Sequence, residues 1–104
     1  MIGRLRHRVG VYIPSETADD IGGTVTRWSF DRAVWAEVRS TGISETVIDG
    51  RAVVLESFRV TLRYDLFFPQ QVRLMWKGRQ LRVLAQSDPD GRAERRHLLC
   101  EAEA

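Results

Sequence analysis

Phe58-Arg59-Val60-Thr61-Leu62-Arg63-Tyr64 is the stretch that decides the fold. Apolar and polar residues alternate in it with a period of two, which is typical of a β-strand with one buried and one solvated face. Three other blocks alternate in the same way: Leu5 to Val9, Val34 to Arg39, and Leu81 to Ala85, which runs into Ser87-Asp88-Pro89-Asp90. Strands are therefore expected to make up most of the structure.

Turn signals divide the chain into about seven short strands. Pro14 is expected to end the first strand, because proline cannot donate to a ladder of hydrogen bonds. Asp31-Arg32 is expected to turn the chain after a strand over residues 24–30, and Lys77-Gly78 fits a two-residue hairpin turn. Short strands with turn signals about every 8–12 residues predict an all-β fold, a small antiparallel β-barrel of about six to seven strands.

Residues 40–55 interrupt this pattern, because they have no two-residue period. Ser44 is a suitable N-cap for a short helix from Glu45, but Gly50 weakens such a helix by about 1 kcal/mol relative to alanine. We therefore expect one long loop here, with a short helix as the alternative. A loop of this length is uncommon in a small domain and is often functional, although a surface connection is the simpler interpretation.

The core is expected to consist of apolar residues on the inward faces of these strands. The expected members are Val9, Val11, Trp28, Phe30, Val34, Val38, Phe58, Val60, Leu62, Leu74, Trp76, Leu81, Val83 and Leu98. Cys100 is the single cysteine, which excludes a disulfide within the chain. Its apolar context indicates a small core thiol and not a reactive one.

Length and composition set the broad class of the protein. The 104 residues are expected to form a single domain over 1–104, and 43% of them are hydrophobic, which favours a folded chain. No apolar run approaches the roughly 18 residues of a membrane span, and no secretory signal is expected behind Met1. The protein is expected to be made in the cytoplasm.

Catalytic and metal sites are not expected. His7 and His97 have no cysteine or carboxylate at the spacing of metal ligands. The chain has no phosphate-binding loop and no nucleophile elbow, so we expect no catalytic residue, no metal and no cofactor.

Charge is balanced overall but uneven along the chain. The net charge is +2, and Lys77 is the only lysine among 16 basic residues. Codon bias explains the excess of arginine simply, and bidentate contacts to carboxylates or phosphates explain it functionally. Residues 1–14 and 70–86 carry only bases, whereas residues 15–23 carry only acids. Local fields of both signs favour self-association.

Two further features point to contacts with other subunits. Trp35 lies on the face opposite to Val34, Ala36 and Val38, so its side chain is expected to be exposed. If Lys77-Gly78 is the turn, Arg73 stands opposite Arg82, and this like-charged pair is expected to require an anion from a partner. The expected subunit or partner interface consists of Arg4, Arg6, Arg8, Glu16, Asp19, Asp20, Trp35, Arg73 and Arg82.

The order and spacing of the four blocks resemble the phage head–tail joining (head-closure) family, and the resemblance covers nearly the whole chain. It implies a small β-barrel with one long loop and a structural, non-enzymatic role in the virion of a tailed phage or of a phage-derived particle such as a gene transfer agent. Proteins of this family form a ring between the portal complex and the tail. A location at the head–tail interface is therefore implied.

The resemblance also implies partners and a channel gate. The partners are other copies of the chain in a dodecameric ring, a portal-side adaptor, a tail terminator or other tail protein, and double-stranded DNA that passes without sequence-specific binding; no membrane is implied. The gate would be the long loop, whose net negative charge suits reversible contact with DNA. Its residues are Gly42, Ile43, Ser44, Glu45, Thr46, Val47, Ile48, Asp49, Gly50 and Arg51.

The alternative from another class is a small β-barrel module that binds single-stranded nucleic acid or RNA. Trp28, Trp35, Tyr64 and Trp76 are interleaved with arginine, as in a platform on which bases stack. A place in the core is the simpler explanation for Trp28 and Trp76, and the small net charge argues against a dedicated single-strand binder.

Overall fold

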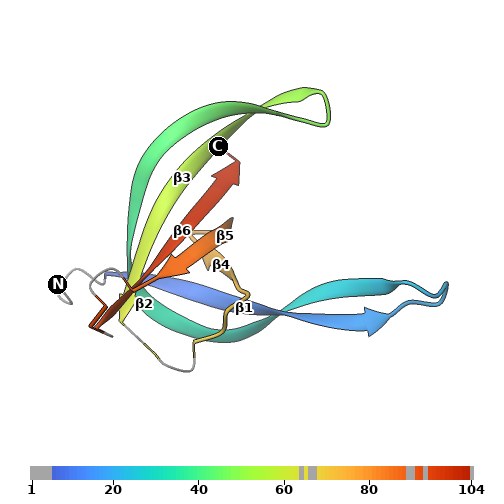
Figure 1. Ribbon diagram of the computed structural model, residues 1–104, viewed down its shortest axis with the longest axis horizontal. Helices are drawn as coiled ribbons and strands as arrows, with labels where there is room; N and C mark the ends of the chain where they lie inside the picture. The colour runs from blue at the N-terminus through green and yellow to red at the C-terminus, as the bar shows by residue number, and fades with distance from the viewer. Residues whose placement is uncertain (1–5, 64, 66–67, 89–90, 93, 104) are drawn as a thin grey trace.

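The computed structural model describes residues 6–63, 65, 68–88, 91–92 and 94–103. Strands, and no helix, make up the regular structure of this part of the chain. The strands are β1 (His7–Ala18), β2 (Thr24–Ile48), β3 (Arg51–Arg63), β4 (Arg73–Trp76), β5 (Arg79–Ser87) and β6 (Arg95–Glu103). All neighbours pair antiparallel in the order β1-β2-β3-β6-β5-β4, and β4 returns to β1, so the sheet closes into a barrel (Figure 1). The expected small antiparallel β-barrel is confirmed.

The junction between β1 and β4 closes the barrel with few contacts. It consists of the pairs Gly10↔Met75, Val11↔Leu74 and Tyr12↔Arg73. Val11 and Leu74 are fully buried there. The short β4 strand is therefore held against β1 mainly by apolar packing inside the barrel.

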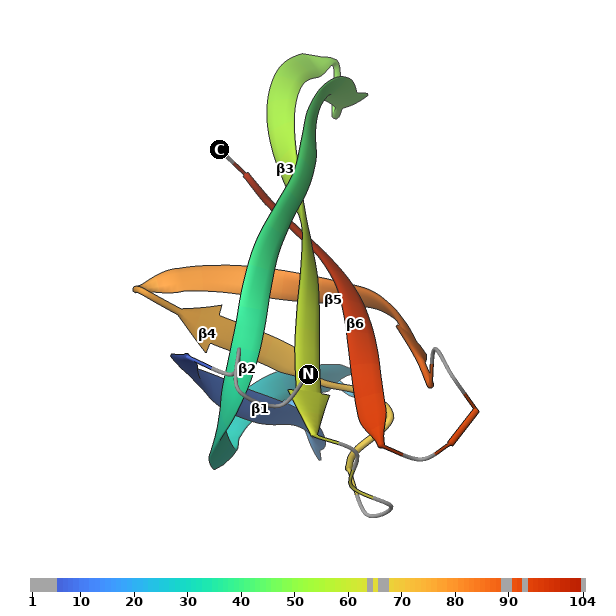
Figure 2. The same ribbon diagram turned by 90° about the vertical axis from the view of Figure 1, so that its left-hand side faces the viewer.

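Two long hairpins project from the barrel as arms (Figures 1 and 2). The β1–β2 arm includes the pairs from Ile13↔Ser29 to Ala18↔Thr24, and the β2–β3 arm includes those from Gly42↔Ser57 to Ile48↔Arg51. The radius of gyration is 15.3 Å, larger than the roughly 13 Å typical of a compact domain of about 100 residues. The arms account for this extended shape.

The expectation of a long loop or a short helix at residues 40–55 is wrong, because this segment is the β2–β3 arm. Asp49 (φ 53°) and Gly50 (φ 75°) form its tip, and positive φ at both residues is what a type I′ hairpin turn needs. A bulge at Thr41 interrupts the pairing between Ser40 and Gly42. The bulge and apolar residues on both faces of the arm hide the two-residue period.

Two expected strand ends are also wrong. Pro14 lies within β1, opposite Trp28, where β1 has β2 as its partner and β4 no longer pairs with it. A proline is tolerated at such an edge because one side of the strand needs no donor. Asp31 does not turn the chain but is an extra residue in β2, since Val11 pairs with Arg32 and Tyr12 with Phe30. Such a bulge bends the strand without ending it.

Most of the expected core is confirmed. Val9, Val11, Phe58, Val60, Leu62, Leu74, Leu81 and Leu98 are buried, and Val34, Val38, Trp76 and Val83 pack against them. Cys100 is buried as expected, and burial raises the pKa of its thiol to about 12. Five further residues are buried that were not among the expected core, namely Ala36, Val53, Phe68, Val72 and Ala102.

Phe30 and Trp28 are the errors in the expected core. Phe30 is 59% exposed and makes an edge-to-face contact with Tyr12, with ring centroids 5.6 Å apart. Trp28 is half-buried, outside the core cluster. The extra residue Asp31 shifts the alternation by one position, so Phe30 and Trp28 share a face with Tyr12 and Pro14 and not with the buried Val11.

Candidate docking surfaces

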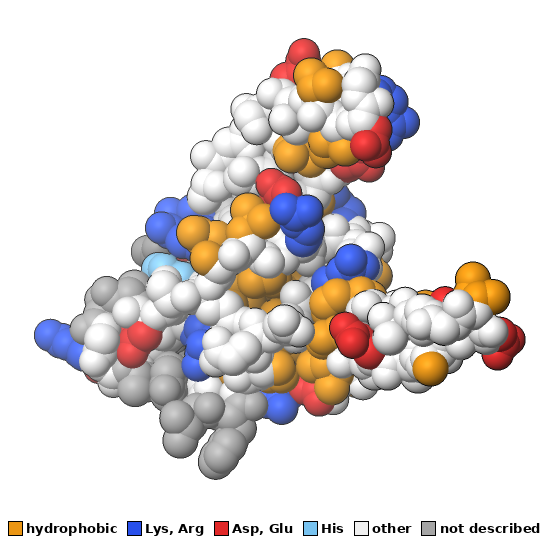
Figure 3. Space-filling model, turned by 45° about the vertical axis from the view of Figure 1, so that its right-hand side comes forward, with side chains coloured by type: hydrophobic (Ala, Val, Ile, Leu, Met, Phe, Trp, Pro, Cys, Tyr) orange, Lys and Arg blue, Asp and Glu red, His pale blue; other side chains and the backbone are white. Residues whose placement is uncertain are grey.

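Figure 3 shows a hollow between the two arms, and we call it the notch. Two cavities of about 430 and 440 Å³ adjoin it, and Arg73 and Arg82 line both. Ile48 of the β2–β3 arm lines one cavity, and Trp28 of the β1–β2 arm lines the other. The β4–β5 hairpin thus forms the floor of the notch and the arms form its walls.

Arg73 and Arg82 stand opposite each other on this floor, as the Lys77-Gly78 turn predicted. The Arg73 guanidinium lies over the Trp28 ring, 4.4 Å from its centroid. The Arg82 Nη2 atom lies 3.3 Å from Glu101 Oε1. The expectation that this pair has no compensation within its own chain is therefore wrong, and its role toward a partner stays a prediction.

The β2–β3 arm carries the residues expected to line a channel, Gly42 to Arg51. Ile43, Val47 and Ile48 are 68%, 70% and 44% exposed, and Val54 on the returning strand is 42% exposed. Glu45, Asp49 and Arg51 are exposed between them. A two-stranded arm with apolar side chains in solvent has more to gain from a partner than a solvated loop has.

The end of the β1–β2 arm is acidic, and we call Glu16, Asp19, Asp20 and Ile21 the acidic tip. The Asp19 Oδ1 atom accepts hydrogen bonds from the backbone N–H groups of Ile21 (3.0 Å) and Gly23 (2.7 Å), so Asp19 builds the turn. Ile21 is 92% exposed at its apex. The tip therefore presents one apolar side chain among carboxylates.

The outer face of β1, β2, β3 and β6 is basic. Register places Arg39 opposite Arg59, and Arg63 opposite Arg95, while Arg8 stands opposite Trp35. We call Arg8, Trp35, Arg39, Arg59, Arg63 and Arg95 the arginine face. Figure 2 looks onto these strands from outside, and Figure 1 shows the β1–β2 arm pointing away from them.

Trp35 is 54% exposed on this face, as expected, and the Arg8 guanidinium lies 5.1 Å from its ring centroid. Arg6 is also exposed. Arg4 lies outside the described residues. Arg39, Arg59 and Arg63 were not expected to form a group, although the two-residue period already placed them on outward faces.

The three tryptophans, all within the described residues, do not form one stacking platform. Trp76 packs against the core and contacts His7 and Phe58 edge-to-face, at centroid distances of 5.3 and 5.9 Å. Trp28 lies in the notch and Trp35 on the arginine face. Tyr64 is outside the described residues. The arrangement gives little support to a series of stacked bases.

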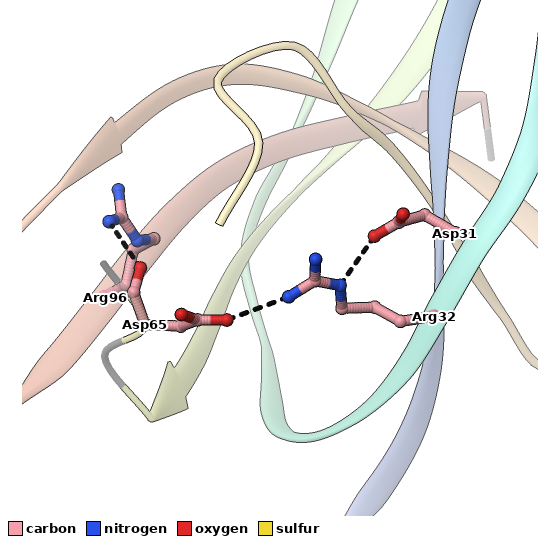
Figure 4. A network of polar contacts seen from close by, with 4 residues as sticks. All are labelled: Asp31, Arg32, Asp65 and Arg96. Atoms are coloured by element: carbon pink, nitrogen blue, oxygen red, sulfur yellow. Dashed lines mark hydrogen bonds and ion pairs between the residues drawn. The ribbon is translucent and has the colours of Figure 1, made fainter. Parts of the chain in front are cut away.

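A polar network on another side of the barrel is structural. Figure 4 shows Arg32 between Asp31 and Asp65, with Arg96 beyond Asp65. Arg32 Nη1 lies 2.8 Å from Asp65 Oδ2, and Arg96 Nη2 donates to the Asp65 carbonyl oxygen at 3.2 Å. The pKa of Arg32 is raised, mainly by its hydrogen bond to Asp31. The network ties the bulge in β2 to the segment after β3.

The described part of the chain contains no group of three or more His, Cys, Asp or Glu residues placed to hold a metal ion. It also contains no helix with the length and apolar character needed to cross a membrane.

Comparison with known proteins identifies the family. Residues 1–103 match the model of the phage head completion protein family, so the chain belongs to that family. Membership supports a structural, phage head-related role and a virion location, with other virion components as partners.

Two solved structures share the fold. A chain from the virion of a native gene transfer agent particle superposes with a TM-score of 0.86 at 23% identity, covering 97% of this chain and 96% of that one. A protein from Shigella flexneri 2a, solved in solution, gives a TM-score of 0.70 at 25% identity, covering 97% and 95%. No curated protein sequence matches the chain.

Proposed function

We propose that the chain is a head–tail connector, one subunit of a homo-oligomeric ring that joins a portal-side adaptor to a tail protein. The observation that carries this proposal is the β2–β3 arm, a long hairpin with exposed Ile43, Val47 and Ile48. Such an arm is marginal alone and needs neighbours to cover its apolar side chains. A ring of identical subunits, dodecameric by the family resemblance, supplies neighbouring arms at the same height.

In this proposal the arms point into the channel and close it behind packaged DNA. Apolar contacts between Val47 and Ile43 of adjacent arms hold the closed state. Glu45 and Asp49 outnumber Arg51 on the arm, so phosphates of passing DNA gain no strong attraction. Double-stranded DNA then passes without sequence-specific binding when the arms separate.

The test shortens the arm without disturbing the barrel. Ser44 pairs with Leu55, so residues 45–54 are replaced by Asn-Gly, which makes a new two-residue turn between them. We expect the variant to enter particles and the filled heads to lose DNA. Filled heads that retain DNA with the shortened chain incorporated would contradict the gate.

The control alters the same arm without shortening it. Ser44→Thr with Ala52→Ser changes two exposed side chains of the β2–β3 arm and leaves its register and its exposed apolar residues in place. This variant keeps the full length of the arm, so particles that incorporate it should retain DNA. If both variants leak equally, any change in the arm disturbs the ring and its length has no special role.

A further inference from the structure

We propose that the acidic tip of one copy docks on the arginine face of the next copy, and this inference rests on the proposed ring. The interface joins two different surfaces head-to-tail, which is the kind of contact that closes rings. The occupant of the arginine face is therefore a second copy of the chain.

Three arginines of the arginine face, Arg39, Arg59 and Arg63, take part in none of the ion pairs of the described residues. The Arg59 Nε atom is buried and has no hydrogen-bond acceptor. Like charges directly opposite each other on a sheet are destabilising, so Arg39↔Arg59 gains from an incoming anion.

The shape of this region suits an inserted acidic side chain. A hollow of about 300 Å³ lies at the edge of the face, lined by Arg6, His7, Glu37, Val38 and Arg39. Arg6 and Arg39 supply two cations there and Glu37 supplies one acid. Trp35 is exposed nearby on the same face of β2 as Glu37 and Arg39. Tryptophan and arginine are the residue types that anchor protein interfaces.

The acidic tip is complementary to this face. Glu16, Asp19 and Asp20 carry its charge, and residues 15–26 contain no base. Ile21, at 92% exposure, supplies an apolar contact for Trp35. The tip and the face lie on opposite sides of the molecule (Figures 1 and 2), so one copy can give its tip to one neighbour and receive the tip of another.

The first test is cross-linking. A chain with both Asp20→Cys and Arg39→Cys is treated with a short bis-maleimide, in particles and as concentrated purified protein. Cys100 stays silent because it is buried and the pKa of its thiol is raised to about 12. We expect a ladder of oligomers that requires both cysteines. No ladder in either preparation, or dimers from either single-cysteine variant, would overturn the head-to-tail contact.

The second test is a charge swap that spares Asp19, because Asp19 builds the turn. Glu16→Arg with Asp20→Arg reverses the charge of the tip, and Arg8→Glu, Arg39→Glu and Arg63→Glu together reverse the charge of the face. We expect each reversal to reduce incorporation into particles and self-association at least tenfold. All five substitutions in one chain should restore both. A five-substitution chain as defective as either parent would exclude the contact.

Other partners bound to the arginine face would give different results in these experiments. Binding of a double-stranded DNA fragment at physiological salt, lost on Arg39→Glu with Arg63→Glu and accompanied by no ladder, would assign the face to DNA and overturn the inference. A cross-link in particles to a protein of another mass would assign it to a different virion component. If the chain is present in particles but gives no ladder, the connector proposal holds and only this interface is excluded. If purified chain gives a ladder but the chain never enters particles, the interface holds and the connector proposal fails.

Discussion

Arg73 lies directly opposite Arg82 across the β4–β5 hairpin, but the two guanidinium groups turn to different partners. Arg73 lies over the Trp28 ring of the β1–β2 arm, and Arg82 pairs with Glu101 of β6. Each interaction is worth about 0–1 kcal/mol at an exposed site. Together they offset the repulsion between the two cations and link the floor of the notch to both sides of the barrel.

Glu101→Arg is expected to destabilise the monomer, because Arg82 and Glu101 are register partners and the substitution places two guanidinium groups opposite each other. The loss should be about 0.5–1 kcal/mol of unfolding free energy at low salt and smaller at high salt. Chemical denaturation at two salt concentrations measures it. Glu94→Arg, an equal charge change at an exposed site outside the strands, should have little effect. Equal losses from both variants would show that net charge alone is responsible.

Val60→Asp is expected to prevent folding, because Val60 is fully buried between β2 and β6. An isolated carboxylate there loses its hydration without gaining a partner, which costs more than most small domains can tolerate. Val54→Asp is the control on the same strand, since Val54 is 42% exposed on the arm. Circular dichroism should show a cooperative melt for the control and none for Val60→Asp. A native-like melt for Val60→Asp would show that Val60 does not lie in the core of the barrel.

Glu56 is expected to make the free energy of unfolding depend on pH in the acid range. Hydrogen bonds from Ser40 and from Arg79 hold the pKa of this carboxyl below its usual range. Because the folded pKa is lower than the unfolded one, the stabilisation is complete above the unfolded value and is lost as pH falls through the folded value. The stability difference between wild type and Glu56→Gln should therefore shrink from pH 7 to about pH 3. A constant difference would argue against the ionised pair.

Cys100 is expected to resist alkylation in the folded chain. Desolvation raises the pKa of its thiol to about 12, so little thiolate is present at pH 8, and its neighbours cover it. Mass spectrometry after maleimide treatment should show an unmodified native chain and a fully modified chain in urea. Rapid native modification would mean that β6 opens readily.

The barrel was predictable from local patterns, because its strands keep one buried and one solvated face. The alternation from Phe58 to Arg63 matches the burial of Phe58, Val60 and Leu62. Lys77-Gly78 fixed one register correctly. The β2–β3 arm was not predictable in this way. Ile43, Val47 and Ile48 do not pack on their own barrel, so nothing imposes a one-sided pattern on the arm.

Local patterns also predicted part of the candidate surfaces. The two-residue alternation predicted that Trp35 is exposed, and the run of acidic residues predicted Glu16, Asp19 and Asp20 as a surface cluster. The arginine face depends on which strands become neighbours. Arg63 meets Arg95 only because β3 pairs with β6, far along the chain, and Arg39 meets Arg59 in a register that follows the bulge at Thr41. Local sequence does not encode either relationship.

The short junction between β1 and β4 has a consequence for folding kinetics. It brings together residues such as Val11 and Leu74 that are far apart in sequence, with three pairs to offset the entropy of closing so long a loop. We expect it to form last and to open first. Each opening exposes the unpaired edges of β1 and β4 next to the apolar interior. Domain swapping of β4 between newly made chains would begin there. Rapid incorporation into a larger structure would protect the chain from this route to misassembly.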